Sequence, residues 1–169
     1  MKIYNLLDKK KEKLIKQYIV DNKDSLYKFA YSYTRNQNDA LDIVHDAICK
    51  ALTNKDSLKS EEKIKPWIYQ IISNCAIDYM RKNNKYTEIT DEIQNENMVG
   101  FDEYENFDLQ RAMQLLPEKY KRVIILRYFE DMKISEITEV LGENESTIKT
   151  RLYSGLSKLK IELTKVEEV

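Results

Sequence analysis

Glycine and proline are scarce in this sequence, with three glycines and two prolines among 169 residues. Proteins built from β-sheets need more turn-forming residues than this, whereas helices joined by short loops need few. The hydrophobic share of 42% is too high for a wholly disordered chain. The composition therefore predicts an all-α fold.

Long apolar runs are also missing, since none approaches the ~18 residues of a membrane span. We expect no signal peptide, no direct membrane insertion and a cytoplasmic location. Cys49 and Cys75 are far apart and lack metal-binding spacing, so we interpret both as reduced core residues. There is no Ser/His/Asp set, no Cys/His set and no glycine-rich phosphate loop, so we expect neither an enzyme nor a bound cofactor.

Charge is distributed unevenly along the chain, although the net charge is only −1. Residues 1–90 carry 17 Lys and Arg against 12 Asp and Glu, and residues 109–169 carry 11 against 10. Residues 91–108 carry seven acids and no base. The pattern predicts a helical domain over 1–82, an acidic flexible linker over 83–106 and a second helical domain over 107–169.

Helical periodicity is clear in the first block. Asn38 is a plausible N-cap, with Asp39 favourable in the first turn of its helix. Residues 54–63 read as a polar loop, and Pro66 suits the first turn of the next helix. Apolar residues recur at helical spacing on three faces: Leu26, Phe29, Ala30 and Tyr33; Ala40, Ile43, Val44, Ala47, Ile48 and Ala51; Ile68, Ile71, Ile72, Cys75, Ala76 and Tyr79.

The last block predicts a helix-turn-helix. A helix from about Phe107 ends at Leu115-Leu116-Pro117, and the next runs to about Phe129. A short helix after Asp131 stops at Gly142. Asn144 can cap a longer helix whose inner face carries Ile148, Leu152, Leu156 and Leu159.

Polar residues on that last helix are candidates for DNA contact, because the second helix of a helix-turn-helix enters the major groove. Ser146, Lys149, Thr150 and Tyr153 project opposite the core face, and Arg151 lies on the flank within reach of phosphate. A solvated helix face is the alternative, since Lys and Arg are common on surface helices.

A second polar stripe lies on the helix that begins near Pro66. Asn74, Asp78 and Arg81 could read base edges, Lys82 could bind phosphate and Trp67 could stack on unpaired bases. Taken alone, an ordinary exposed stripe and a core tryptophan explain these residues better. A third stripe, Asp39, Asp42 and Asp46 with His45 beside it, suggests a basic partner surface; its spacing matches no standard metal site.

Three segments in order resemble the extracytoplasmic-function (ECF) sigma factors. Residues 39–52, DALDIVHDAICKAL, are similar to the part of the second sigma region that grips the polymerase clamp. Residues 65–82, KPWIYQIISNCAIDYMRK, resemble the promoter-melting helix that reads the −10 element. Residues 116–152 resemble the fourth region, whose helix-turn-helix binds the −35 element. The resemblance covers roughly residues 22–162, and the acidic linker stands where larger sigma factors have their third region.

This resemblance implies a factor that binds core RNA polymerase and directs it to promoter DNA. Asp39, Asp42, His45 and Asp46 would contact the clamp helices of the largest subunit, and the fourth region the flap of the second-largest. Trp67, Asn74, Asp78, Arg81 and Lys82 would act at the −10 element, where the loop before Pro66 would hold a flipped base. Ser146, Lys149, Thr150, Arg151, Tyr153 and Ser154 would face the −35 element. An anti-sigma factor is the expected regulator, and the linker would thread the RNA-exit path.

Three positions depart from the family pattern. His45-Asp46 stands where Gln-Glu is common, Lys133 replaces a usual Ser N-cap and predicts a weakly capped helix, and Ser154 replaces a frequent Arg. Two other functions stay open: an autonomous helix-turn-helix regulator, and an adaptor that uses this fold only to bind an anti-sigma protein. Residues 65–82 argue against the autonomous regulator, because a simple repressor needs no strand-opening module. Exposed polar residues suited to reading bases lie on both blocks, and they argue against the adaptor.

Overall fold

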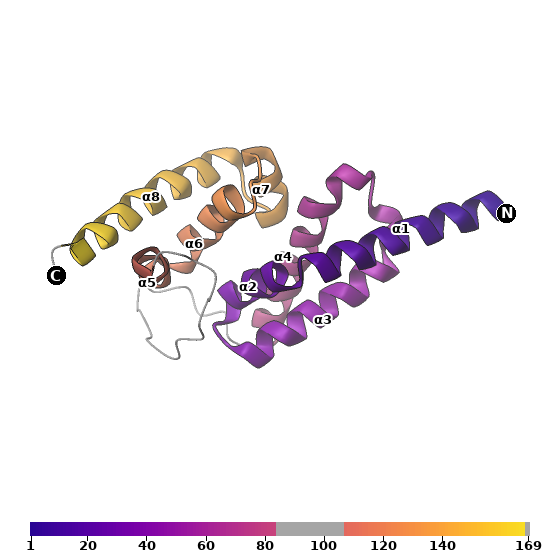
Figure 1. Ribbon diagram of the computed structural model, residues 1–169, viewed down its shortest axis with the longest axis horizontal. Helices are drawn as coiled ribbons and strands as arrows, with labels where there is room; N and C mark the ends of the chain where they lie inside the picture. Colours follow the sequence, from indigo (N-terminus) through magenta and orange to yellow (C-terminus); the bar gives the residue numbers. More distant parts are fainter. Residues whose placement is uncertain (84–106, 168–169) are drawn as a thin grey trace.

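The computed structural model describes residues 1–83 and 107–167, and its regular elements there are all helices (Figure 1). The predicted all-α class is therefore confirmed. The predicted linker lies outside the described residues apart from Asn83. No helix in the two described ranges has both the length and the apolarity to cross a bilayer.

The first half of the chain contributes four α-helices: α1 (Lys2–Asp21), α2 (Lys23–Thr34), α3 (Gln37–Thr53) and α4 (Ile64–Lys82). Two short 3-10 turns, η1 (Lys55–Ser57) and η2 (Glu61–Lys63), connect α3 to α4. The second half contributes α5 (Phe107–Leu115), α6 (Glu118–Ile124), α7 (Ile134–Leu141) and α8 (Glu145–Glu167). A π-helical turn, η3 (Ile125–Phe129), extends α6.

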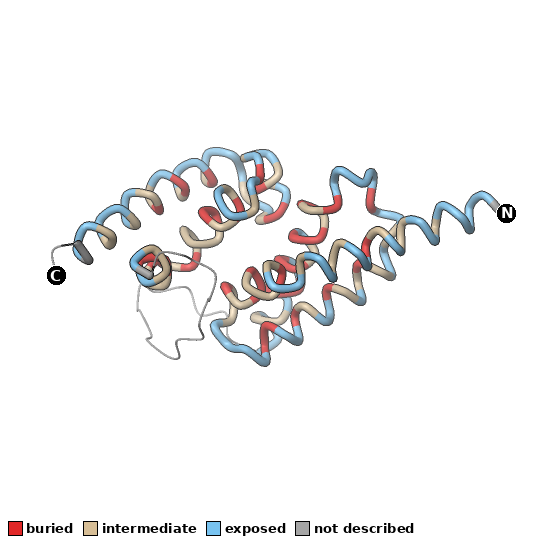
Figure 2. Tube along the Cα trace, viewed as in Figure 1, coloured by how far each residue is buried: buried red, intermediate tan, exposed pale blue. Residues whose placement is uncertain are grey.

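Helices α2, α3 and α4 pack on one another through their periodic apolar faces (Figure 2). Phe29 is fully buried, and its ring centroid lies 5.6 Å from that of Tyr33 and 5.1 Å from that of Tyr69. Such aromatic pairs add about 0.5–1.5 kcal/mol each beyond the area that they bury. Pro66 lies in the first turn of α4, as predicted, where its missing N–H leaves no intrahelical bond unmade.

The lysine-rich opening stretch forms α1, and only part of it packs on the body. Ile15 is fully buried, and Leu14 and Tyr18 pack against the core. The first turns of α1 extend beyond the body, with Ile3 and Leu6 exposed (Figures 1 and 2). The C-terminal part of α1 therefore belongs to the folded domain.

The predicted helix-turn-helix is confirmed in α7 and α8. Gly142 ends α7 in the left-handed conformation, at φ 65°, which a glycine adopts without steric cost. Asn144 caps α8 by accepting a hydrogen bond from the Thr147 N–H at 2.8 Å. Helices α6 and α8 approach closely at Gly155, where an added Cβ would lie 3.1 Å from Tyr120 Cβ.

Two local predictions are wrong. Asn36, not Asn38, caps α3, because Asn36 is extended and its Oδ1 accepts the Asp39 N–H at 3.0 Å, whereas Asn38 is already inside the helix. Cys49 is exposed on α3, so of the two cysteines only Cys75 is a core residue.

Lys133 makes no side-chain capping hydrogen bond at the start of α7, as predicted, but another residue compensates in part. The Glu136 carboxylate accepts a hydrogen bond from the Lys133 N–H at 2.9 Å. This contact satisfies a backbone donor at the start of α7, as the glutamate at position N3 of a capping box does.

Candidate nucleic-acid interface

The first candidate surface is the outward face of α8, defined by Ser146, Lys149, Thr150 and Tyr153. All four side chains are exposed, and Tyr153 retains 67% of its accessible surface. Ile148 and Leu152 lie buried on the opposite face and hold the helix against the domain. The periodicity therefore predicted this face correctly, and we call it the α8 surface.

The cations near the α8 surface already have acidic partners. Lys149 Nζ lies 2.5 Å from Glu145 Oε1, and Arg151 lies 3.0 Å from Glu143 Oε1. The hydrogen bond that Lys149 donates to the Glu145 carboxylate raises the pKa of Lys149. A phosphate that binds Lys149 or Arg151 must displace a carboxylate. The net binding free energy from that contact is therefore smaller than it would be at an unpaired cation. Ser154 is partly buried at the edge of the surface.

The second candidate surface is the outward face of α4, and we call it the α4 surface. Asn74, Asp78, Arg81 and Lys82 are exposed along it. The opposite face of α4 is buried, and Ser73 there shares a 2.7 Å hydrogen bond with the Tyr33 hydroxyl. Arg81 and Lys82 lie in the last turn, where the helix dipole favours cations. An amide, a carboxylate and two cations are thus presented in one row.

Trp67 lies apart from that row, at the start of α4. Its ring is partly buried against the core, and its Nε1–H donates a 3.0 Å hydrogen bond to Ser57 Oγ. The indole is therefore held against the loop that precedes α4 rather than projecting freely. The packing of Trp67 against the core agrees with the first of the two roles that the sequence left open, and its role in stacking on unpaired bases stays a prediction.

The acidic stripe on α3 is shorter than the sequence predicted. Asp42, His45 and Asp46 are exposed, and Asp46 pairs with Lys50 at 3.2 Å. Asp39 is buried, and its Oδ1 accepts a 2.7 Å hydrogen bond from the Tyr79 hydroxyl, which raises the pKa of Tyr79 to about 12. The prediction that Asp39 lies on an exposed face is wrong, because its early position on α3 turns it toward α4.

Ionic contacts that the sequence did not predict join the two halves. Arg35 Nε donates to Glu118 Oε1 at 2.7 Å, and Lys65 Nζ lies 3.6 Å from Glu130 Oε2. The guanidinium of Arg122 lies 3.8 Å from the ring centroid of Tyr33, a cation–π geometry. Helix α4 also packs against α7. We refer to these contacts together as the interdomain contact. They leave the α4 and α8 surfaces exposed.

The buried cysteine has the properties of a packing residue rather than a nucleophile. Cys75 is 2% exposed, and burial raises the pKa of its thiol to about 11. The thiol therefore stays protonated at neutral pH, and a thiol is a poor nucleophile compared with a thiolate. Within the described ranges, no cluster of three or more His, Cys, Asp or Glu side chains could hold a metal ion.

Comparison with known proteins gives two family matches. Residues 18–86 match the family described as Sigma-70 region 2, and residues 106–159 match Sigma-70, region 4. RNA polymerase sigma factor SigV of Bacillus subtilis is 46% identical over 148 residues, which cover 87% of this chain and 89% of that protein. ECF RNA polymerase sigma factor SigW of the same organism is 31% identical over 158 residues, covering 83% and 84%.

A solved structure has the same architecture. The sigma factor RpoE of Bartonella quintana, crystallised with the anti-sigma factor NepR, matches with a TM-score of 0.70 and 25% identity. The match covers 89% of this chain and 96% of that one. The fold agrees over both halves of the molecule.

Proposed function

The chain belongs to the sigma-70 family, in its ECF group of promoter-recognising factors that act with RNA polymerase, and we propose that its two halves divide the promoter between them. The observation that carries this division is the presence of one exposed reading surface in each half. Residues 1–82 would serve the −10 element and polymerase, residues 83–106 would link the halves, and residues 107–169 would serve the −35 element. Such a factor is not an enzyme: it binds and positions, and polymerase performs the chemistry.

The α4 surface is our candidate for the −10 element. Asn74 and Asp78 offer amide and carboxylate groups to base edges, and Arg81 and Lys82 offer cations to bases or phosphates. Trp67 stands next to residues 54–63, the connection in which a base flipped out of the non-template strand would be held. Capture of that base would favour strand separation without ATP.

The α8 surface is our candidate for the −35 element. The N-terminal half of a recognition helix faces base edges in the major groove, and Ser146, Lys149 and Thr150 occupy that half. Tyr153 could contact a thymine methyl group, Arg151 could reach phosphate, and Ser154 lies at the edge of the surface. Because Lys149 and Arg151 are paired with acids, we expect moderate affinity for an isolated −35 element.

Two protein partners complete the proposal. Asp42, His45 and Asp46 would meet the basic clamp helices of the largest polymerase subunit, and the second half would meet the flap of the second-largest. Asp39 is left out because its carboxylate is buried against Tyr79. We also propose an anti-sigma regulator, by analogy with the RpoE–NepR complex.

Run-off transcription tests the proposal directly. Core bacterial polymerase would be incubated with a DNA fragment from upstream of the gene for this chain, with and without the protein. A discrete transcript that requires the protein supports the proposal, and its start site locates both promoter elements. Tight binding to duplex DNA without any binding to core polymerase would instead indicate an autonomous regulator.

A further inference from the structure

Residues 54–63 connect α3 to α4, and we call them the α3–α4 loop. The loop contains both 3-10 turns, η1 and η2, and most of its side chains are exposed. Leu58 is buried, with 1% exposure, and fixes the middle of the loop in the core. In the proposed function this loop holds a flipped base, so its conformation decides how well that base fits.

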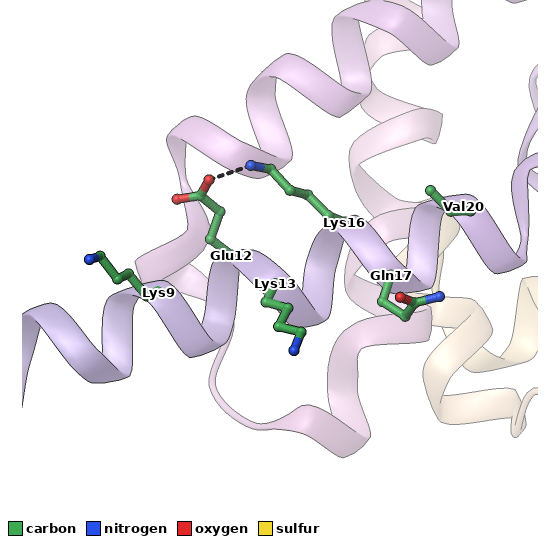
Figure 3. Close-up of a pocket in the computed structure, with 6 residues that line it drawn as sticks. All are labelled: Lys9, Glu12, Lys13, Lys16, Gln17 and Val20. Carbon is green, nitrogen blue, oxygen red and sulfur yellow. Dashed lines mark hydrogen bonds and ion pairs between the residues drawn. The ribbon is translucent and has the colours of Figure 1, made fainter.

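Helix α1 contacts the loop at its beginning. Lys55, the first residue of η1, places its Nζ 2.9 Å from Asp8 Oδ2 and 3.4 Å from Glu12 Oε2. The hydrogen bond that Lys55 donates to the Asp8 carboxylate raises the pKa of Lys55. Glu12 is itself paired with Lys16, as the dashed line in Figure 3 shows. One end of the loop is therefore tied to α1 by a network of four charges.

Helix α1 also contacts the middle and the end of the loop. Lys11 Nζ donates a 3.1 Å hydrogen bond to the backbone carbonyl of Leu58. Lys10 Nζ lies 3.2 Å from Glu61 Oε1 in η2, although both of those side chains are largely exposed. The Lys11 bond is the more informative of the two, because it fixes a main-chain atom rather than a mobile side chain.

The loop is held from its other side by α4. Trp67 donates to Ser57 Oγ, and Ser57 Oγ in turn donates to the Asn54 carbonyl at 2.8 Å. The loop is thus held between the indole of Trp67 on α4 and the side chains of Lys11 and Asp8 on α1. The α1 residues that hold it precede residue 18, where the match to Sigma-70 region 2 begins.

We propose that Asp8, Lys11 and Glu12 are positioning residues, which hold the α3–α4 loop in the shape that receives an extrahelical base of the melted strand. The inference rests on the function proposed above for that loop. These residues need not touch DNA: they act through Lys55 and the Leu58 carbonyl. Loss of their contacts leaves the loop held by Trp67, by the burial of Leu58 and by the exposed Lys10–Glu61 pair. A larger share of its conformations then fails to fit the base.

The test uses the full chain with core polymerase and compares two matched substitutions on α1. Lys11→Met keeps most of the aliphatic stem and removes the donor to Leu58. Lys13→Met makes the same change on the outer face of α1, where Figure 3 shows Lys13 pointing away from Glu12 and Lys16. Promoter opening would be followed by permanganate reactivity of unpaired thymines, and base capture by the fluorescence of 2-aminopurine at the flipped position.

We expect Lys11→Met to lower base capture and promoter opening about fivefold, the effect of losing one hydrogen bond of ordinary strength. Lys13→Met should match the wild type, and all variants should bind core polymerase and the −35 element normally. Asp8→Lys and Lys55→Asp should each lower opening, and the double variant should regain part of it because the pair is re-formed with reversed signs.

Equal opening by the Lys11→Met and Lys13→Met holoenzymes would overturn this inference and leave the proposed function intact. Failure of the wild-type holoenzyme to open any promoter would instead contradict the proposed function itself. A loss of opening that accompanies weaker binding to core polymerase would also overturn the inference, since it would indicate a general loss of structure. Thermal unfolding of each variant identifies that case.

Discussion

Arg35 and Glu118 are 83 positions apart in sequence, yet their side chains form a 2.7 Å ion pair that joins α6 to the end of α2. Glu118 is nearly buried and also accepts a hydrogen bond from Lys121 at 3.1 Å. Arg35 adopts the left-handed conformation, at φ 50°, to end α2. The residue that ends one helix of the first half is thus also an anchor for the second half.

Replacing Arg35 should loosen the interdomain contact. Arg35→Asn removes the guanidinium but retains a residue type that tolerates positive φ. Burial of a carboxylate with one partner fewer costs roughly 1 kcal/mol or more, so we expect a larger population of separated halves. Labels on the exposed Cys49 in α3 and on a cysteine introduced by Ser157→Cys in α8 would report the distance between the two halves. Arg81→Asn is the control, and identical distance distributions for the two variants would contradict the role of Arg35.

Lys149→Ala should weaken binding to −35 DNA and lower the salt dependence of that binding. One fewer phosphate or base contact reduces the slope of log K against log salt by about 1. Lys160→Ala removes an exposed lysine further along α8 and should leave the slope near that of the wild type. Fluorescence anisotropy with a −35 duplex at several salt concentrations measures both slopes. Equal slopes for the two variants would remove Lys149 from the interface.

Ser154→Arg should strengthen binding to the same duplex. Ser154 lies at the edge of the α8 surface, next to Tyr153, so a guanidinium there adds a cation within reach of the backbone. We expect the salt slope to steepen by about 0.9, the contribution of one phosphate contact on duplex DNA. The same anisotropy series decides the matter, because an unchanged slope means that position 154 does not meet phosphate.

Gly155→Ala should destabilise the second half. The added methyl would lie 3.1 Å from Tyr120 Cβ and 3.1 Å from Ile124 Cδ1. The isoleucine end can move, but the tyrosine Cβ is fixed by its backbone, so α6 and α8 must separate. Overpacking of this kind costs about 1–3 kcal/mol, which exceeds the gain of alanine over glycine in helix propensity. Chemical denaturation measures the change. Ser157→Ala, at an exposed position of α8 outside the α8 surface, is the control and should stay within ~0.5 kcal/mol of the wild type.

Alkaline destabilisation should depend on Cys75. Burial raises the pKa of its thiol to about 11, above the ordinary value of 9.0. A raised pKa in the folded state contributes stability that is complete below pH 9 and is lost as the pH rises from 9 through 11. Thermal unfolding at pH 8 and pH 10.5 should therefore show a smaller drop in Tm for Cys75→Ala than for the wild type. Cys49→Ala, on the exposed face of α3, should follow the wild type; a drop for Cys75→Ala equal to that of the wild type would contradict the assignment.

Periodicity in the sequence predicted the helices and their inner faces, because an apolar stripe must be buried whatever packs against it. It predicted the α8 surface through Ile148 and Leu152, and the α4 surface through Ile68 and Ile72. It misplaced the cap of α3 by two residues, since both Asn36 and Asn38 can cap a helix and only backbone geometry distinguishes them.

Contacts between distant charged residues were beyond sequence reasoning. Nothing in the run Lys9-Lys10-Lys11 shows that only the last of the three donates to the carbonyl of Leu58. Glu118 likewise reads as an ordinary first-turn acid of a helix, and its burial against Arg35 depends on how the two halves meet. Local patterns determine which face of a helix is buried, but not which partner meets it.

Because the interdomain contact is ionic, dissolved salt should act on this chain in two opposite ways: it favours separation of the halves and it weakens binding to DNA. Added salt screens Arg35 from Glu118 and Lys65 from Glu130, although less than it screens fully exposed pairs because both carboxylates are largely buried, and so favours separation of the halves modestly. Added salt also weakens every contact with phosphate. A separated chain that spans both promoter elements should therefore form most readily at an intermediate ionic strength, and promoter output should pass through a maximum as the salt concentration rises.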